Sequence, residues 1–266
     1  MKKKSAGSIA VMLLVMVYLL IPLVISIIYS LFKKWTGILP EGFSIGNYTS
    51  LFSDPNFLAS VGRSIGMCIV PILLTIVIVL LALFVTTIYF PKLEKYVQII
   101  CMIPYTIQGV ILSVSILSLY VGTKSVLSNR MVMLMGAYCI VILPYIYQGI
   151  RNGMRAVNMV TLIEAAEMLG ASKIYAFFRV VVPNIISAII VSSLLAVGII
   201  FGDYVLIRNL AGTSAPNMQI FLYQTMKSDS TKASAVFVII MFVTFVITAI
   251  VLFLKSHEGK NRVQKK

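Results

Sequence analysis

The chain has 266 residues, of which 60% are hydrophobic and only 11% are charged, and its mean hydropathy is +1.02. A soluble domain carries roughly 25% charged residues, so this surplus of apolar surface has to face lipid. Continuous apolar runs of about twenty residues are typical of transmembrane helices and exclude the alternating strands of a membrane barrel. The sequence therefore predicts an all-α, polytopic helical membrane protein.

The net charge of +14 does not indicate a nucleic-acid partner. The basic residues cluster at the ends of apolar runs, which favours contact with anionic lipid headgroups. Cys68, Cys101 and Cys139 all lie inside apolar runs and are interpreted as small hydrophobic residues. The single histidine, His257, lies in the charged tail, so a multi-histidine metal site is excluded and no metal site is predicted.

The first apolar run covers residues 9–31 and follows Lys2, Lys3 and Lys4. It is too long for the apolar core of a signal peptide, so it predicts an uncleaved first span with a cytoplasmic N-terminus. The polar, turn-rich residues 33–57 are then external. Within them, Asp54 as N-cap and Pro55 at the first helical position predict the start of a short helix.

Five more apolar runs follow, each long enough to cross a bilayer: residues 66–90, 97–121, 131–150, 184–206 and 233–254. Pro104 predicts a kink near the cytoplasmic end of the third run. Six transmembrane helices with both termini cytoplasmic place 14 of the 22 Lys and Arg residues inside and 8 outside, which is the expected direction.

The predicted organisation has three parts. Residues 1–58 hold the N-terminal tail, the first span and the external segment, residues 59–255 form the transmembrane domain, and residues 256–266 are a basic cytoplasmic tail. The long inside loop of the transmembrane domain, residues 151–183, is the most informative stretch of the chain.

This loop predicts two short helices at the inner face of the membrane. Residues 157–169 have helical spacing, Gly170 supplies a left-handed residue that ends the first helix, and Ser172 caps the second. Pro183 is placed in the first turn of the fifth span. The second helix is expected to have one apolar face, formed by Ile174, Phe177, Phe178 and Val181. Ala165 and Ala166 predict a flat surface beside Glu164, which lets another protein approach closely.

The loop residues have a distinctive spacing: Glu164, Ala165, Ala166, Gly170, Val180, Val182 and Pro183. This spacing resembles the signature loop of integral membrane permeases of ABC importers, the binding-protein-dependent transport family. Residues 43–57 resemble, more weakly, the external segment of the same family. Leu169 stands where many sugar-type members have Asp, and Arg63-Ser64 stands where they have Asn-Thr. The residues 201–205 are more similar to the spermidine/putrescine, iron, phosphonate or thiamine branch.

The resemblance implies a mechanism and a set of partners. Two permease subunits, identical or homologous, form the pathway, and each places its loop in a groove of one of two cytoplasmic ATPase subunits. An extracytoplasmic binding protein delivers the substrate across a bacterial cell membrane. The chain lacks a Gly-x-x-x-x-Gly-Lys-[Ser/Thr] phosphate loop, so it is predicted to be no enzyme and to bind no cofactor, with ATP used by the partner ATPase.

Four residues are candidates for the substrate pathway. Asp203 is the only acid in a predicted span; it either pairs with a cationic substrate or is an interfacial carboxylate exposed to water. Gln108, Tyr145 and Gln148 either line the pathway or hydrogen-bond neighbouring helices. The expected substrate is a small polar or charged solute such as a polyamine, iron or phosphonate.

The sequence is less typical of two other classes of membrane protein. An autonomous channel or an ion-coupled secondary carrier needs charged or polar rings within its spans, and these are nearly absent. A membrane enzyme needs clustered carboxylates or histidines, whereas the eight acids are scattered along the chain.

Overall fold

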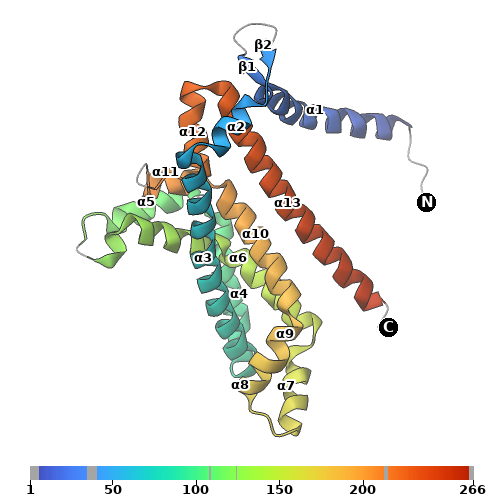
Figure 1. The fold of residues 1–266 in the computed structure, drawn as a ribbon. Helices are drawn as coiled ribbons and strands as arrows, with labels where there is room; N and C mark the ends of the chain where they lie inside the picture. The colour runs from blue at the N-terminus through green and yellow to red at the C-terminus, as the bar shows by residue number, and fades with distance from the viewer. Residues whose placement is uncertain (1–5, 35–40, 108, 124, 213–214, 264–266) are drawn as a thin grey trace.

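The computed structural model of the chain describes residues 6–34, 41–107, 109–123, 125–212 and 215–263. Helices make up most of this part (Figure 1), as the sequence predicts. Four of them are long and apolar enough to cross a bilayer: α1 (Ala6–Ser30), α3 (Pro55–Ile88), α6 (Arg130–Ala156) and α13 (Ser230–Val263). Two pairs of bent helices also pass this test when each pair is taken as one span. The described residues therefore hold four to six candidate spans.

The third apolar run is broken around Pro104, a larger change of direction than the predicted kink. α4 (Glu94–Met102) passes into the short helix η2 (Ile103–Thr106), and α5 (Gly109–Tyr120) then leaves at 102°. Proline lacks a backbone N–H and its ring clashes with the preceding turn, which explains why the α-helix stops here. Ile107 is extended and completes the break.

The segment between α1 and α3 holds a hairpin and a short helix: β1 (Phe32–Lys34), β2 (Glu41–Phe43) and α2 (Gly46–Phe52). The strands pair antiparallel with Phe32 opposite Phe43, and the two ring centroids lie 6.0 Å apart. Asp54 caps α3 by accepting a hydrogen bond from the Asn56 N–H at 2.9 Å, which confirms the predicted cap. The helix that starts at Pro55 is not short, however. It continues through the second span as one helix of 34 residues.

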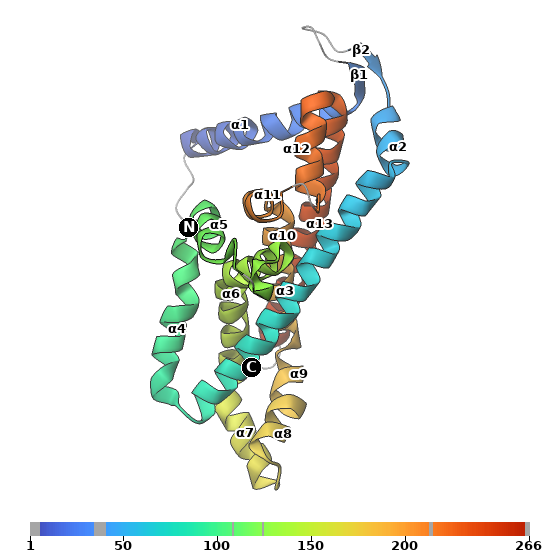
Figure 2. The ribbon, with the colours of Figure 1, turned by 90° about the vertical axis from the view of Figure 1, so that its left-hand side faces the viewer.

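Short elements connect the remaining long helices and form the two ends of the molecule. One end carries the hairpin with α11 (Val205–Leu210) and α12 (Met218–Ser228), and the opposite end is formed by α7 (Met159–Met168), α8 (Lys173–Ala176) and α9 (Val182–Asn184) (Figures 1 and 2). The other connecting elements are η1 (Pro91–Leu93), η3 (Val126–Ser128) and η4 (Phe177–Val181). α10 (Ile186–Gly202) packs against α3, α6 and α13.

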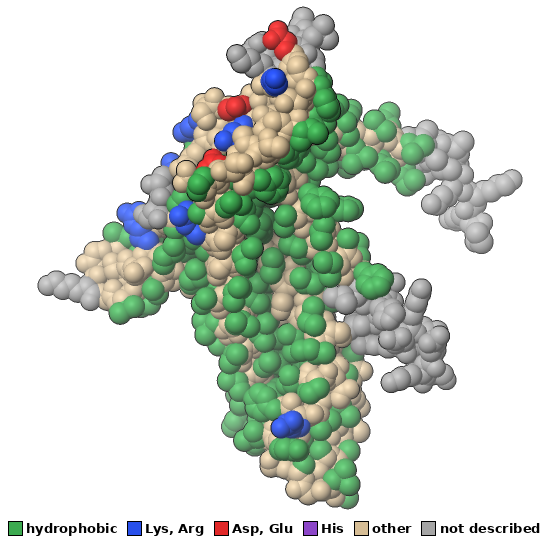
Figure 3. Space-filling view, in the orientation of Figure 1, with side chains coloured by type: hydrophobic (Ala, Val, Ile, Leu, Met, Phe, Trp, Pro, Cys, Tyr) green, Lys and Arg blue, Asp and Glu red, His purple; other side chains and the backbone are tan. Residues whose placement is uncertain are grey.

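The surface of the molecule follows the same division. Figure 3 shows hydrophobic side chains over most of the body, whereas Lys, Arg, Asp and Glu gather at the end that carries α11 and α12. An apolar belt below a polar end is the distribution expected of a chain that crosses a bilayer.

Most of α1 extends away from the body of the molecule (Figures 1 and 2), although the helix contacts α13. No residue in the most apolar stretch of α1 is buried within the described structure. A helix that is apolar all round is stable only when something covers it. For α1 that cover comes from outside the chain, as lipid or as another subunit.

α6 and α10 approach each other closely at a position where both helices carry small residues. A Cβ atom added to Gly153 of α6 would lie 2.6 Å from the Cβ of Ala188 in α10, and one added to Gly149 would overlap Ser192. The pattern of two small residues four positions apart therefore occurs on both helices. In membranes this pattern allows close backbone packing, and it fixes α6 against α10 at this crossing.

The close approach generates the first prediction. Gly153→Ala should lower the melting temperature of the purified chain in detergent, because overpacking costs about 1–3 kcal/mol. Gly136→Ala in the same helix is the matched control, since a Cβ there meets nothing within 4 Å. The control should leave the melting temperature unchanged or raise it, because alanine is the better helix former. Equal melting temperatures for the two variants would contradict the proposed crossing.

Candidate functional site

The predicted end of the first loop helix is confirmed. Gly170 has φ +86° and follows the last turn of α7. The Gly170 N–H donates to the carbonyl of Glu167 at 2.9 Å, and the Ala171 N–H donates to the carbonyl of Ala166 at 3.0 Å. This pair of bonds is the Schellman motif, which satisfies carbonyls that a helix end leaves free. The loop therefore turns sharply between its two helices.

The second loop helix begins where it was predicted, but its α-helical geometry then gives way to a π-helical turn. The Ser172 hydroxyl accepts a hydrogen bond from the Tyr175 N–H at 3.3 Å and caps α8. The helix continues through the π-helical turn η4 into α9. Phe177 and Val181 are buried, as predicted, but Ile174 and Phe178 are about half exposed. The single apolar face expected from α-helical spacing is thus wrong in part, because a π-turn adds a residue and rotates what lies on either side.

Two aromatic contacts attach the loop to the end of α3. The buried ring of Phe177 lies 4.6 Å from that of Phe84, measured between centroids. The Lys173 ammonium lies 5.8 Å from the centre of the Tyr89 ring, within the range of a cation–π contact. The loop therefore contacts the end of α3 in addition to joining α6 and α10.

The structure separates the two alanines of the loop motif. Glu164 and Ala165 are exposed on α7, whereas Ala166 is buried. The predicted flat surface of two alanines is therefore corrected to Ala165 beside Glu164. Ala166 faces the chain's own interior because α7 packs against α8 and η4.

The last three residues of the loop motif lie on η4 and α9, where the loop leads back to α10. Val180 and Val182 are half-buried and Pro183 is exposed. Pro183 lies in the first turn of α9, the short helix directly before α10. The segment that ends with α9 meets α10 at an angle of 66°. α10 starts only at Ile186, because Ile185 departs from helical geometry.

The tip of the loop carries two exposed apolar side chains. Met168 and Leu169 are each 89% exposed and lie directly before Gly170. Met168 and Leu169 follow Glu164 and Ala165 at the end of α7, and α7 and α8 lie at the end of the molecule opposite the hairpin (Figure 1). Contiguous exposed apolar side chains typically mark an interaction site.

A cavity of about 510 Å³ lies between α6 and α10 and is bordered by η2. Tyr145 and Gln148, two of the predicted pathway residues, line it. The Tyr145 ring lies 4.9 Å from that of Tyr105, which also lines the cavity. Asn152 and Asn184 add amide groups, and the described lining includes no Asp, Glu, Lys or Arg. The cavity thus offers aromatic faces and uncharged hydrogen-bonding groups.

Of the other two pathway candidates, Asp203 is not among the residues that line this cavity. Gln108 lies outside the described residues. Asp203 lies between α10 and α11, where its Oδ2 accepts hydrogen bonds from the Leu206 N–H at 3.1 Å and the Tyr138 hydroxyl at 3.3 Å. A carboxylate at a helix N-terminus satisfies free backbone donors and is stabilised there. These contacts give Asp203 a structural role, and its role in the pathway stays a prediction.

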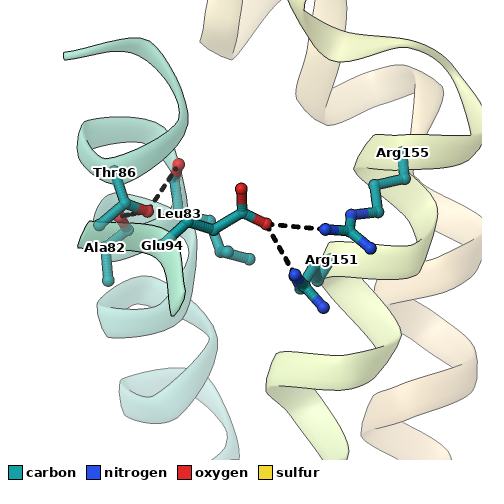
Figure 4. A network of polar contacts seen from close by, with 6 residues as sticks. All are labelled: Ala82, Leu83, Thr86, Glu94, Arg151 and Arg155. Carbon is teal, nitrogen blue, oxygen red and sulfur yellow. Dashed lines mark hydrogen bonds and ion pairs between the residues drawn. The ribbon is translucent and has the colours of Figure 1, made fainter. Parts of the chain in front are cut away.

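An ion-pair network near the loop was missed by the sequence interpretation (Figure 4). Glu94 Oε1 accepts hydrogen bonds from Arg151 Nε at 3.0 Å and Nη2 at 2.8 Å, and from Arg155 Nη2 at 3.0 Å. The network joins the start of α4 to the end of α6. The sequence did hold a signal, since Glu94 is the only acid between Asp54 and Glu164, and the arginines are spaced four apart on one helix face.

Comparison with known proteins identifies the family. Residues 93–259 match the model of the "Binding-protein-dependent transport system inner membrane component" family, which is more than half of the chain. The chain belongs to this family. The resemblance to ABC importer permeases is therefore confirmed, and with it a multi-pass location in a bacterial inner membrane and ATP hydrolysis by separate ATPase subunits.

Individual relatives of the permease are distant. A protein named for 2-aminoethylphosphonate transport, the permease PhnV of Salmonella typhi, is 21% identical over 203 residues and covers 76% of both chains. PhnV of Salmonella typhimurium is 22% identical over 183 residues, 68% of both chains. These relatives fall in the phosphonate branch and outside the sugar branch.

A solved structure confirms the fold of the permease. A chain of a bacterial ABC transporter involved in the import of the acidic polysaccharide alginate matches with a TM-score of 0.66 and 18% identity, over 94% of both chains. A second structure of the alginate transporter, in complex with a periplasmic protein, matches with a TM-score of 0.65 and 17% identity, over 94% of this chain and 93% of that one.

The ion-pair network generates the second prediction. Glu94→Gln should lower the melting temperature of the purified permease, because two arginines lose the negative charge of their shared carboxylate and charge-assisted hydrogen bonds are about twice as strong as neutral ones. Glu94→Arg combined with Arg151→Glu restores one opposite-charge pair and should recover part of the loss. A double variant that melts no higher than Glu94→Arg alone would show that the pairing does not stabilise the fold.

Proposed function

We propose that this permease forms half of the solute pathway of an ABC importer and is moved by an ATPase subunit that docks on the tip of the α7–α8 loop. The observation that carries the proposal is the exposed surface of Glu164, Ala165, Met168 and Leu169 at one end of the molecule. The loop that presents this surface is attached to α3, α6 and α10, so a partner bound at the tip acts on three long helices.

The proposed topology has six transmembrane helices with both termini in the cytoplasm. The two bent pairs count as the third and fifth spans. This arrangement puts the loop on the cytoplasmic side, where ATP is available, and the hairpin with α11 and α12 outside. The divisions at residues 58/59 and 255/256 belong to this proposal.

The proposed assembly holds two permease subunits, two ATPase subunits and an extracytoplasmic binding protein. A requirement for a binding protein is contained in the family description. The uncovered helix α1 and the one-sided cavity between α6 and α10 support a second permease subunit, because a pathway needs a wall on both sides. Lipid covers the remaining apolar surface.

The proposed solute is small and polar or charged, with a phosphonate that carries an amine as the leading candidate. The PhnV relatives, named for 2-aminoethylphosphonate transport, support this class. The cavity supports it on chemical grounds. The Tyr105 and Tyr145 rings suit an ammonium group through cation–π contact, and the amides of Gln148 and Asn152 offer hydrogen-bond donors to an oxyanion.

The third prediction tests docking. Glu164→Lys should weaken co-purification of the ATPase subunit at least tenfold and abolish ATP-driven uptake into vesicles, because breaking an interfacial charge pair costs about 2–5 kcal/mol. The yield in the membrane fraction should stay unchanged. Glu41→Lys makes the same charge reversal at the opposite end and should leave both readouts intact. Normal uptake by Glu164→Lys would reject the docking role.

The fourth prediction tests the cavity. Gln148→Trp should reduce uptake strongly by filling the proposed pathway, while ATPase co-purification stays at the level of the unmodified chain. Ile78→Trp is the control, because Ile78 is exposed on α3 away from the cavity. Undiminished uptake with Gln148→Trp would place the pathway elsewhere.

A further inference from the structure

A second, smaller pocket lies where α3, α4, α6 and the start of α7 meet. Its volume is about 180 Å³, and it shares no lining residue with the cavity between α6 and α10. Its polar part is lined by Thr87, Glu94, Arg151, Arg155 and Asn158. Its apolar part is lined by Leu83, Met154, Met159 and Val160. The pocket therefore has a polar side and an apolar side.

The charges in this pocket do not balance. Two guanidinium groups share one carboxylate, and all three hydrogen bonds of the network end on the same oxygen, Glu94 Oε1 (Figure 4). Arg151 is largely buried, with 15% of its side chain exposed, and it binds Glu94 through two nitrogens. Arg155 is 60% exposed and donates to Glu94 only from Nη2. Because a guanidinium has five N–H donors, Arg155 retains donors for an anion.

The surroundings add to the positive charge. Lys92 and Lys95 are exposed on the turn between α3 and α4, next to Glu94 in sequence. Glu94 is the only acid on this turn and on α6. In the topology of the proposed function, this corner lies at the cytoplasmic surface of the membrane, whose lipids are partly anionic. Basic pockets between spans on that side bind anionic headgroups.

We propose that this pocket binds the phosphate of an anionic phospholipid from the inner leaflet. Arg155 contacts the phosphate, with Thr87 and Asn158 as hydrogen-bonding neighbours, and the first carbons of the lipid lie along Val160, the exposed member of the apolar lining. A free phosphate ion has the same charge chemistry, but it leaves the apolar side of the pocket unused. The proposal depends on the proposed function only for the side of the membrane on which the pocket lies.

The position of the pocket gives the lipid a consequence for coupling. Asn158, with φ +51°, is the residue at which the chain turns from α6 into α7, and it lines the pocket. A bound headgroup therefore contacts the root of the docking loop. It stabilises the junction through which the loop moves α6.

The test compares variants of Arg155 and Arg179 in the full-length permease. The unmodified chain, Arg155→Gln and Arg179→Gln are purified in mild detergent and titrated with phosphatidylglycerol or phosphatidylcholine, with bound lipid counted by native mass spectrometry. Arg179 is exposed on η4 outside the pocket, so its variant makes the same change in charge. Phosphatidylglycerol should bind Arg155→Gln at least about fivefold more weakly than the unmodified chain, and Arg179→Gln should behave like the unmodified chain. Arg155→Lys, which keeps the charge, should retain most of the binding.

Three outcomes would overturn the proposal. If Arg155→Gln and Arg179→Gln weaken phosphatidylglycerol binding equally, the lipid is attracted to the positive surface as a whole and not to the pocket. An equal rise in melting temperature with inorganic phosphate and with phosphatidylglycerol would make free phosphate the ligand. If Arg155→Gln changes phosphatidylglycerol binding only after ATPase subunits are added, the pocket is part of a protein interface. Glu164→Lys should leave lipid binding unchanged, so a failure of the docking proposal is distinguishable from a failure of this one.

Discussion

The close packing of α6 on α10 is the contact on which the rest of the structure depends. The loop leaves the body at the end of α6 and returns at the start of α10, so the two helices act as its two supports. Gly149 and Gly153 bring the backbones together because they place no side chain against Ser192 and Ala188. The two supports are therefore held close together where they cross.

The irregular backbone of the permease lies beside the cavity. Tyr105 belongs to η2 at the 102° break, and Ile185 lies at the 66° bend, and both line the cavity between α6 and α10. Non-helical backbone within a membrane is tolerated where protein or a water-filled space satisfies its polar groups, and broken helices recur at transport sites for this reason. The cavity between α6 and α10 therefore lies beside both breaks in the helical backbone.

Features with a local cause were predictable from the sequence. The caps at Asp54 and Ser172 and the left-handed Gly170 each depend on a few neighbouring residues, and all three are confirmed. Features that join distant segments were not. Glu94 and Arg151 are 57 positions apart, and the burial of Ala166 depends on how α7 packs on a second helix. The break at Pro104 was predictable only in part. Proline indicates where a helix is disturbed, but not how far the chain then turns.

The most direct test of the account is a site-specific crosslink from the loop tip in the native membrane. A photoactivatable amino acid at Ala165 is illuminated in intact cells, the tagged permease is purified, and the adduct is identified by mass spectrometry. The account predicts an adduct with an ATP-binding-cassette ATPase subunit, and none when the same amino acid replaces Glu41 at the opposite end. Adducts with lipid alone, or with the ATPase from Glu41 and not from Ala165, would contradict it.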